Sequence, residues 1–245
     1  MRGSPEERAA VRASFKRMNK KEKAEYILTY YRLPLFTAFV VIVVLITSLV
    51  HHFTKKESVL YLANVNIVIG ETMTEKMSNE YLTSVGKDPK RTEVLIYHDL
   101  YIDEDPSSEN HQYAYASKLK ILGAISSKRM DLALMNKNGF EQMSASGLLL
   151  KVDTLLAGHP ELYEKLKPYM TEGTVILEDN SIEYDLNEAD TYESVTEQQV
   201  NAFDVSSFPI FRNAGMDGKL YIAVIANTTH PDEACSYLEY LLNAD

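Results

Sequence analysis

The most distinctive hydrophobic pattern is an uninterrupted apolar run near the N-terminus. The run LPLFTAFVVIVVLITSLV covers residues 33–50 and contains no charged side chain. As an α-helix it would span about 27 Å, close to the thickness of the hydrocarbon core of a bilayer. Tyr30, Tyr31 and Phe53 flank the run, as aromatic residues do at membrane interfaces. A helix buried in a soluble core normally keeps a polar stripe, so the pattern predicts a transmembrane helix over residues 33–53.

Beyond this run, stretches typical of buried strands alternate with stretches typical of helices. Largely apolar, β-rich segments predict strands over residues 58–69, 92–102 and 130–135. Helical spacing of apolar residues fills the two gaps, over residues 70–86 and 112–129. Strand–helix–strand–helix–strand order with helices of this length favours a parallel, doubly wound α/β sheet.

The rest of the chain adds shorter elements and a well-marked end. The helix predicted over residues 112–129 places Tyr115, Leu119 and Leu122 on one face. Residues 219–227 predict a further strand, and a helix that starts near Pro231 follows it. Three weaker strand candidates precede them, at residues 174–179, 181–186 and 200–206.

The charge distribution predicts an orientation in the membrane. Residues 1–32 carry nine Lys or Arg and four Glu, whereas residues 33–245 carry sixteen basic and thirty-one acidic side chains. Basic residues that precede a span favour a cytoplasmic N-terminus. The run is longer than a usual signal-peptide core and bulky residues follow it, which favours an uncleaved signal anchor. We therefore expect a single-pass cell-membrane protein with an extracytoplasmic domain over residues 54–245.

Residues 1–32 are expected to form a basic cytoplasmic segment with an amphipathic helix. Asn19 can cap this helix, and Glu22 stands at the spacing of a capping box. Lys20, Lys21 and Lys23 are poorly placed at a helix N-terminus, where lipid headgroups are better partners. We expect the lipid bilayer to be a partner of this segment, chiefly through the positive charge that orients the anchor.

The motifs of catalysis and metal binding are missing from the sequence. The six His residues are scattered, and no Gly-x-Ser-x-Gly motif or phosphate loop occurs. Cys235 falls on the apolar side of the last helix, where packing is the expected role. The acidic loops lack the glycine and terminal glutamate of a calcium-binding EF-hand. We therefore expect no enzymatic activity, cofactor or metal ion, and no nucleic-acid partner.

A ligand site in an open α/β sheet lies beyond the carboxyl ends of its strands. Polar residues follow each of the first three predicted strands, and two aromatic residues in SSFPIFRN are placed to form an opposing wall. The candidate ligand contacts are Glu71, Thr72, Asp103, Asn136, Asn138, Phe140, Phe208 and Phe211. Each of them can also serve as a helix cap or pack against a loop.

The order of elements around residues 128–156 resembles a known family. The segment ISSKRMDLALMN, a polar turn, and then FEQMSASGLLLKVDTLL are similar to bacterial extracytoplasmic solute-binding proteins, the receptors of ABC importers. The late segment YIAVIANTTHPDEACSYLEYLL is similar to the strand and helix near the end of that family. The resemblance implies a doubly wound mixed sheet of periplasmic-binding-protein type. Because only residues 58–245 are available for it, the second lobe is expected to be reduced.

Three residues in this region have structural roles that follow from elementary chemistry. Asp131, at the start of a predicted strand, can cap a neighbouring turn. Gly147 permits the positive φ at which a helix stops. Asp153 can serve as the N-cap of the segment TLLAG.

Two functions of different classes remain open from the sequence. The first is a membrane-tethered solute-binding-like domain that recognises a small molecule or peptide, as a receptor, sensor or transporter accessory. The second is a structural or interaction subunit that keeps the fold without a ligand and docks to another membrane protein. A pocket at polar strand ends would favour the first, and a filled cleft with an exposed apolar patch the second.

Overall fold

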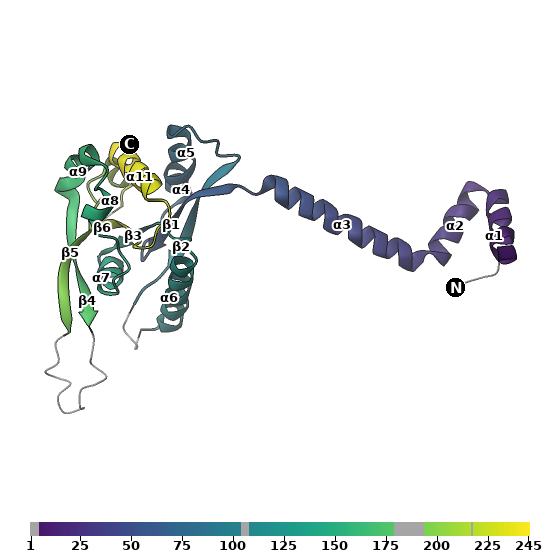
Figure 1. Cartoon of the computed structure of the whole chain (residues 1–245), viewed down its shortest axis with the longest axis horizontal. Helices are drawn as coiled ribbons and strands as arrows, with labels where there is room; N and C mark the ends of the chain where they lie inside the picture. The colour runs from purple at the N-terminus through teal and green to yellow at the C-terminus, as the bar shows by residue number, and fades with distance from the viewer. Residues whose placement is uncertain (1–4, 104–107, 179–193, 217) are drawn as a thin grey trace, which may run out of the picture. The chain divides into compact units, whose positions relative to one another are not determined.

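The computed structural model describes residues 5–103, 108–178, 194–216 and 218–245. These residues fall into two compact units, Met1–Lys55 and Lys56–Asp245. The first unit is helical and the second is an α/β domain (Figure 1). The strand candidate at residues 181–186 lies outside the described residues.

The N-terminal unit consists of three helices, α1 (Pro5–Arg17), α2 (Lys20–Tyr30) and α3 (Arg32–Thr54). The predicted capping box at the start of α2 is present, because the Glu22 amide donates to Asn19 Oδ1 at 2.9 Å and the Asn19 amide donates to Glu22 Oε2 at 2.9 Å. Helix α3 contains the apolar run, and its segment Arg32–Leu49 is long and apolar enough to cross a membrane. None of that segment is buried within the protein, so its apolar side chains are free to face lipid.

The second unit is built on one six-stranded mixed sheet with the order β2-β1-β3-β6-β5-β4. Its strands are β1 (Glu57–Val65), β2 (Thr92–Leu100), β3 (Leu132–Asn136), β4 (Met170–Glu178), β5 (Val195–Asp204) and β6 (Leu220–Val224). Strand β1 pairs in parallel with β2 and β3, whereas β6, β5 and β4 follow in antiparallel pairs. The predicted α/β class and mixed sheet are therefore confirmed. Among the described residues this unit forms one body around one sheet, and no second lobe is separate from it.

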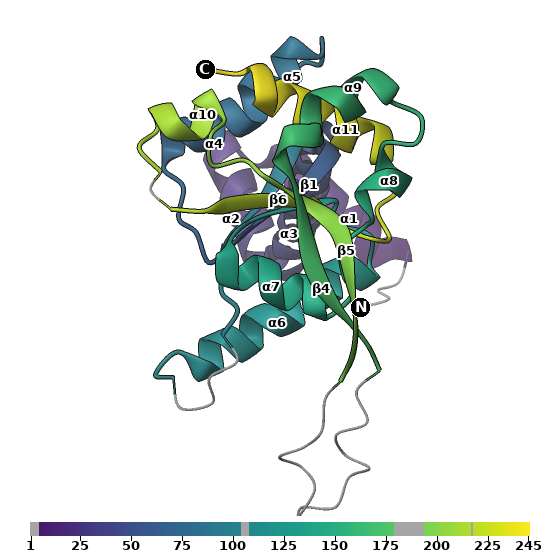
Figure 2. The ribbon, with the colours of Figure 1, turned by 90° about the vertical axis from the view of Figure 1, so that its left-hand side faces the viewer.

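Helices cover both faces of the sheet (Figure 2). One face packs against α6 (His111–Ser126) and α7 (Lys137–Ala145), in a core that includes Ala63, Val65 and Ile121. The other face packs against the remaining helices, in a core that includes Leu62, Tyr81 and Leu238. These helices are α4 (Glu71–Glu75), the π-helical turn η1 (Lys76–Glu80), α5 (Tyr81–Ser84), α8 (Val152–Leu155), α9 (Pro160–Leu166), the 3₁₀ turn η2 (Lys167–Tyr169), α10 (Pro209–Asn213) and α11 (Pro231–Asn243). Adjacent residues such as Leu62 and Ala63 serve opposite cores because side chains alternate across a strand.

Helix ends confirm the expected role of Gly147 and correct that of Asp153. Gly86 and Gly147 have φ values of 73° and 66°, in the left-handed region where glycine has no steric penalty. Asp153 does not cap a helix, because α8 begins at Val152 and its N-cap position is Lys151. Asp153 instead lies in the first turn of α8, where an acidic side chain complements the helix dipole.

Helix α6 exposes the face that the sequence pattern singles out. Tyr115, Leu119 and Leu122 share one side of the helix, and they are 61%, 53% and 39% exposed. The buried side includes the small residues Ala114 and Ala124 together with Ile121 and Ile125, which pack in the core against the sheet.

Candidate ligand-binding site

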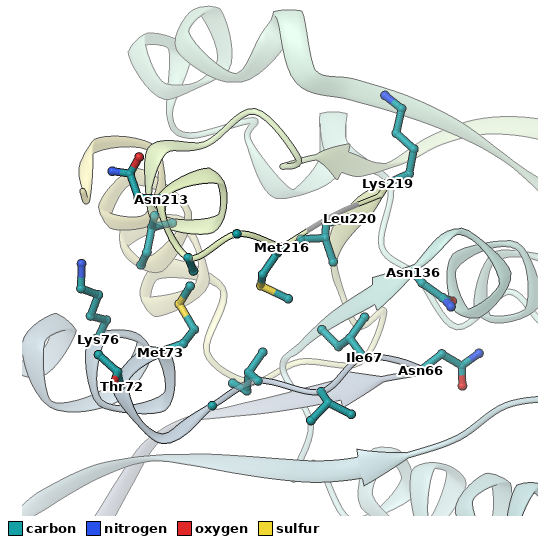
Figure 3. A pocket seen from close by; sticks show the side chains of 16 residues that line it. Asn66, Ile67, Thr72, Met73, Lys76, Asn136, Asn213, Met216, Lys219 and Leu220 are labelled. Atoms are coloured by element: carbon teal, nitrogen blue, oxygen red, sulfur yellow. The ribbon is translucent and has the colours of Figure 1, made fainter.

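The parallel half of the sheet creates a topological switch point between β1 and β3. Strand β2 lies on one side of β1 and β3 on the other, so the connections that follow β1 and β3 diverge. Ligands in open α/β sheets bind outside the carboxyl ends of strands at such a point. A pocket of about 710 Å³ lies there, bordered by the segment after β1, the end of β3, and the segment from α10 to β6 (Figure 3).

Two asparagines occupy the strand ends at one side of the pocket (Figure 3). Asn66 follows β1 with φ of 56°, a conformation that Asn tolerates better than most residues. Its Oδ1 accepts the Ile102 amide at 2.7 Å, and its Nδ2 donates to the Ile102 carbonyl at 2.8 Å. Asn136 ends β3 and caps α7, where its Oδ1 accepts the Gly139 amide at 2.9 Å. These bonds fix both side chains before any ligand arrives.

The other walls come from elements far apart in the sequence. Thr72, Met73 and Lys76 belong to α4 and η1, and they face the segment of Asn213 and Met216. Met73 and Met216 point toward one another across the pocket (Figure 3). The apolar part of the lining is completed by Ile67, Val68, Ile69, Ile210 and Leu220.

The charge of the lining is positive among the described residues, which contribute Lys76 and Lys219 and no acidic side chain. The two lysines differ in the partners of their ammonium groups. Lys219 forms an ion pair with Asp204, which raises the pKa of Lys219. Burial raises the pKa of Asp204, but hydrogen bonds from Lys219 and Ser206 outweigh it and lower the pKa overall. Lys76 instead donates to a main-chain oxygen of Asp245 and not to a side-chain carboxylate.

Of the predicted contacts, Thr72 and Asn136 line this pocket. Glu71 begins α4 but is not part of the lining, and it is exposed. Asn138 donates its Nδ2 to the Ile102 carbonyl at 3.2 Å, so it supports the loop behind the pocket. Asp103 lies in a different hollow with His111 and Lys118, and its Oδ2 accepts the Tyr101 hydroxyl at 3.2 Å.

The three predicted aromatic contacts do not line the pocket. Phe140 is buried and stacks on Tyr221 at a ring distance of 4.8 Å. Phe208 and Phe211 are also buried, and Phe208 packs edge-on against Tyr169 at 5.0 Å. A phenylalanine ring stabilises the fold most when it is fully buried. The residues of α10 that line the pocket are instead Ile210 and Asn213.

Several lining residues were missed because the first strand was predicted too long. The strand ends at Val65 rather than Ile69, so residues 66–70 form a pocket wall instead of extending β1. Asn66 was the available signal, since asparagine adopts positive φ more readily than the β-branched residues around it. No local sequence pattern indicates a role for Lys76, Asn213 and Lys219, because their segments come together only in the folded domain.

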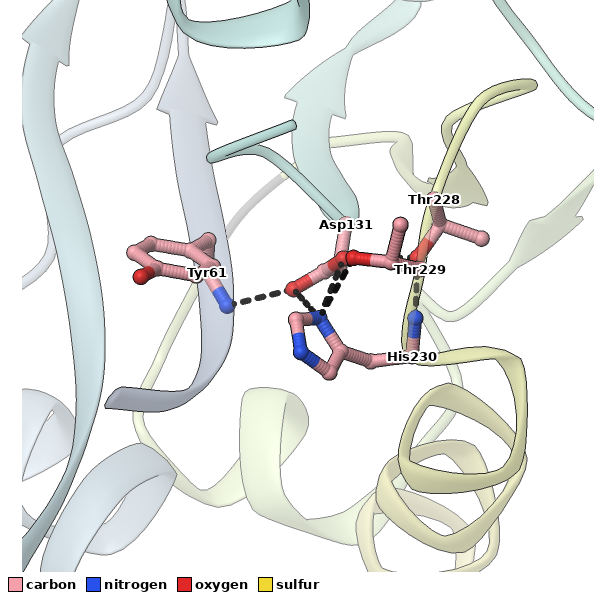
Figure 4. Close-up of polar contacts among 5 residues, drawn as sticks. All are labelled: Tyr61, Asp131, Thr228, Thr229 and His230. Carbon is pink, nitrogen blue, oxygen red and sulfur yellow. Dashed lines mark hydrogen bonds and ion pairs between the residues drawn. The ribbon is translucent and has the colours of Figure 1, made fainter. Parts of the chain in front are cut away.

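A second polar cluster lies at the amino end of β3, centred on Asp131 (Figure 4). Asp131 is fully buried and accepts the Tyr61 amide at 2.9 Å and the Thr228 hydroxyl at 2.6 Å. His230 Nδ1 lies 3.0 Å from Asp131 Oδ1, and the His230 amide donates to the Thr228 hydroxyl at 3.1 Å. Asp131 therefore joins three segments, where the sequence predicted only the cap of one turn.

Metal and thiol chemistry find little support in the described part of the chain. No group of three or more His, Cys, Asp or Glu side chains there is arranged to hold a metal ion. Cys235 is buried, and desolvation raises the pKa of its thiol to about 11. At neutral pH such a thiol stays protonated and is a poor nucleophile.

Comparisons with protein-family models, with curated proteins and with solved structures found no match.

Proposed function

We propose that the Lys56–Asp245 unit binds a small molecule or peptide in the pocket between the ends of β1 and β3. The observation that carries this proposal is the pocket itself, whose volume of about 710 Å³ lies within the range of small-ligand sites. Its position outside the carboxyl ends of parallel strands is the usual position of ligands in open α/β sheets. Asn66 and Asn136 are already fixed by backbone bonds, so little side-chain ordering opposes binding there.

The lining indicates the class of ligand. Uncharged amide groups from Asn136 and Asn213 offer both donors and acceptors, and Lys76 supplies a positive charge. Met73 and Met216 adapt to irregular apolar shapes because thioether side chains are flexible. We therefore expect a ligand with an apolar body and a polar or anionic group.

The membrane role belongs to the same proposal. Helix α3 serves as a signal anchor with a cytoplasmic N-terminus, which leaves the ligand-binding unit extracytoplasmic. The excess of Lys and Arg before the span supports this orientation. Together with the resemblance to solute-binding proteins of ABC importers, this suggests a tethered receptor, sensor or transporter accessory. Exposure of the unit to protease on intact cells tests the orientation, and resistance that disappears only on permeabilisation contradicts it.

A matched pair of variants tests whether the pocket binds ligands. The full chain in detergent is screened by thermal shift against amino acids, oligopeptides, sugars and organic anions. A ligand at about 100 times its Kd adds about 2.7 kcal/mol, which raises Tm by about 5–10 °C for a domain of this size. Thr72→Trp should abolish the shift because Thr72 lines the pocket, whereas Glu71→Trp, one residue away, should preserve it.

Two results contradict the proposal. One is the absence of any shift across the panel, and the other is an equal shift in the two variants, which would locate the ligand elsewhere. Both variants replace exposed residues in the first turn of α4, so neither should change the Tm of the free protein much.

The second candidate, an interaction subunit without a ligand, has one observation in its favour. Large apolar side chains are exposed on helix α6, at Tyr115, Leu119 and Leu122. Exposed patches of this kind commonly mark contact with a protein or a membrane. The open pocket favours ligand binding as the primary function, since an interaction subunit has no need for a cavity at the switch point.

A further inference from the structure

The segment between β1 and α4 borders the pocket with its main chain as well as with its side chains. Residues 66–70 all line the pocket, and residues 67–70 form no helix, strand or turn. Adjacent side chains in such a non-helical segment point in different directions, so they cannot all face the same cavity. Gly70 lines the pocket although it has no side chain. The peptide groups of this segment therefore lie at the pocket wall.

The peptide groups of residues 67–69 have no hydrogen-bond partner among the described residues. Their neighbours on both sides do have partners. The Asn66 amide donates to the Leu100 carbonyl at 2.8 Å, and the Gly70 carbonyl accepts the Thr74 amide at 2.9 Å. Buried amide and carbonyl groups in proteins are nearly always paired. A molecule that covers residues 67–69 must therefore supply hydrogen bonds in place of water.

Val68, in the middle of this segment, is unusually open to solvent. It is 84% exposed, more than any other large apolar residue in the described part of the Lys56–Asp245 unit. A single exposed apolar residue is common on protein surfaces, but here it coincides with unpaired peptide groups in a pocket wall. A bound molecule that covers Val68 removes this apolar surface from water. The same molecule is then placed to bond with the peptide groups beside it.

Another wall of the pocket is also formed by consecutive residues, 213–216. The amides of Gly215 and Met216 already donate to carbonyl groups of α10, at 3.1 Å and 3.2 Å. The carbonyl groups of Ala214 and Gly215 accept no hydrogen bond from the part of the chain that the structure describes. Met216 points toward Met73 (Figure 3). This wall therefore offers acceptors and an apolar side chain to a bound molecule.

The charge of the lining restricts how a peptide could bind. Among the described residues the lining has no acidic side chain. A free amino terminus is positively charged at neutral pH, and burying it without a carboxylate partner is unfavourable. A peptide ligand is therefore expected to be acylated at its amino terminus or to keep that terminus outside the pocket.

We propose that the ligand of this pocket is a peptide in extended conformation, whose main chain hydrogen-bonds to residues 67–69 and whose apolar side chains contact Met73 and Met216. An extended peptide presents an amide and a carbonyl group at each residue, and its side chains alternate. Three residues of extended chain span about 10 Å, so roughly three or four residues of peptide match the unpaired segment. Free amino acids are too short to do so, and sugars lack the repeated amide groups. The proposal rests on the proposed function, because it assigns a ligand class to the same pocket.

Pools of N-acetylated tetrapeptide amides test this assignment on the full chain in detergent. Each position is alanine, valine, leucine, methionine or asparagine, and the pool that raises Tm most is resolved to one peptide. Each backbone nitrogen of that peptide is then methylated in turn, and the Kd of every analogue is measured by isothermal titration calorimetry. We expect methylation at alternate nitrogens to weaken binding about five- to tenfold, the usual contribution of one hydrogen bond. Methylation at the nitrogens between them should change Kd by less than about threefold, because their N–H groups point away from the segment.

A valine substitution locates the peptide on this segment. Val68→Ala should raise Kd about three- to tenfold, because the peptide loses apolar contact, whereas Val195→Ala should leave Kd unchanged. Val195 is a matched control, since it is 53% exposed on β5 and does not line the pocket. Both residues are exposed, so the Tm of the free protein should change little and a loss of affinity is not a loss of folding.

The possible failures separate this assignment from the proposed function. Shifts that only free amino acids, sugars or organic anions produce, and that Thr72→Trp abolishes, would leave the proposed function standing and overturn the peptide. Equal effects of methylation at every nitrogen, or none, would also overturn it, since the main chain would then not pair with residues 67–69. Equal Kd values for Val68→Ala and Val195→Ala would place the peptide elsewhere. The absence of any shift contradicts both proposals.

Discussion

The two ends of the parallel strands use polar residues in opposite ways. At the amino end of β3, the carboxylate of Asp131 is buried, and each of its oxygens has a partner from Tyr61, Thr228 or His230. At the carboxyl ends of β1 and β3, Asn66 and Asn136 use part of their hydrogen-bonding capacity on the backbone and border an open pocket. A polar cluster alone therefore does not identify a site. A candidate binding site is distinguished by side chains that keep unused hydrogen-bonding capacity and border an open pocket.

This difference in hydrogen bonding also indicates which polar residues stabilise the fold and which can in addition bind a ligand. Internal bonds that are complete stabilise the fold and have nothing left to offer a ligand, whereas a side chain that is only partly satisfied can do both. Substitutions at the two ends should thus affect unfolding and ligand affinity in different proportions. The expected loss of stability is largest for substitution of Asp131, smaller for Asn66 and smallest for Asn213.

Asp131→Ala should lower the free energy of unfolding by about 3–5 kcal/mol, because it leaves three buried or partly buried donors without their acceptor. Urea unfolding of the full chain in detergent, followed by tyrosine circular dichroism, measures the change. Asp232→Ala is the control, because the side chain of Asp232 is 88% exposed. Similar losses in the two variants would show that the Asp131 cluster is not a structural tie.

Asn66→Ala should lower the free energy of unfolding by about 2–3 kcal/mol, because it removes both bonds to Ile102 and puts alanine in a left-handed conformation. Asn66→Gly separates the two causes, since glycine tolerates the conformation but restores neither bond. We expect about 1 kcal/mol less destabilisation from glycine than from alanine. The same unfolding measurement applies, and equal losses would indicate that φ at this position carries no strain for alanine.

Asn213→Ala should change the free energy of unfolding by no more than about 0.5 kcal/mol, because Asn213 is exposed and no side-chain hydrogen bond ties it to the described residues. Its effect should appear instead in ligand affinity, measured by titration with whichever compound the thermal-shift screen identifies. Loss of stability without loss of affinity would reverse the distinction drawn between the two ends of the sheet.

The sequence predicted the parallel half of the sheet better than the antiparallel half. Strands β1, β2 and β3 are compact apolar runs separated by helices, and such runs can be recognised from neighbouring residues in the sequence. Strand β4 has buried residues only at alternate positions in its middle, and the first four residues of β5 are exposed, so the sequence pattern of both strands is weak. Their place in the sheet depends on pairing with each other and with β6, which local periodicity does not encode.

The position of the site was easier to predict than its members. The rule about carboxyl strand ends points to the region where the pocket lies, and Thr72 and Asn136 are the predicted residues that line it. It failed for Phe208 and Phe211, since a local sequence cannot tell which side of a one-turn helix faces the core. It could not find Lys219, because the ion pair and pocket around this residue arise from segments joined only in the folded domain.

The π-helical turn η1 has a consequence for how the domain would respond to a ligand. The carbonyl groups of Lys76 and Met77 accept hydrogen bonds from the hydroxyl groups of Tyr240 and Tyr237, at 2.8 Å and 2.9 Å. Because Lys76 also lines the pocket, a ligand that displaces this turn must either break those bonds or carry α11 with it. The hydroxyl groups of Tyr237 and Tyr240 therefore tie the turn that borders the pocket to α11, whose inner side is buried in the core.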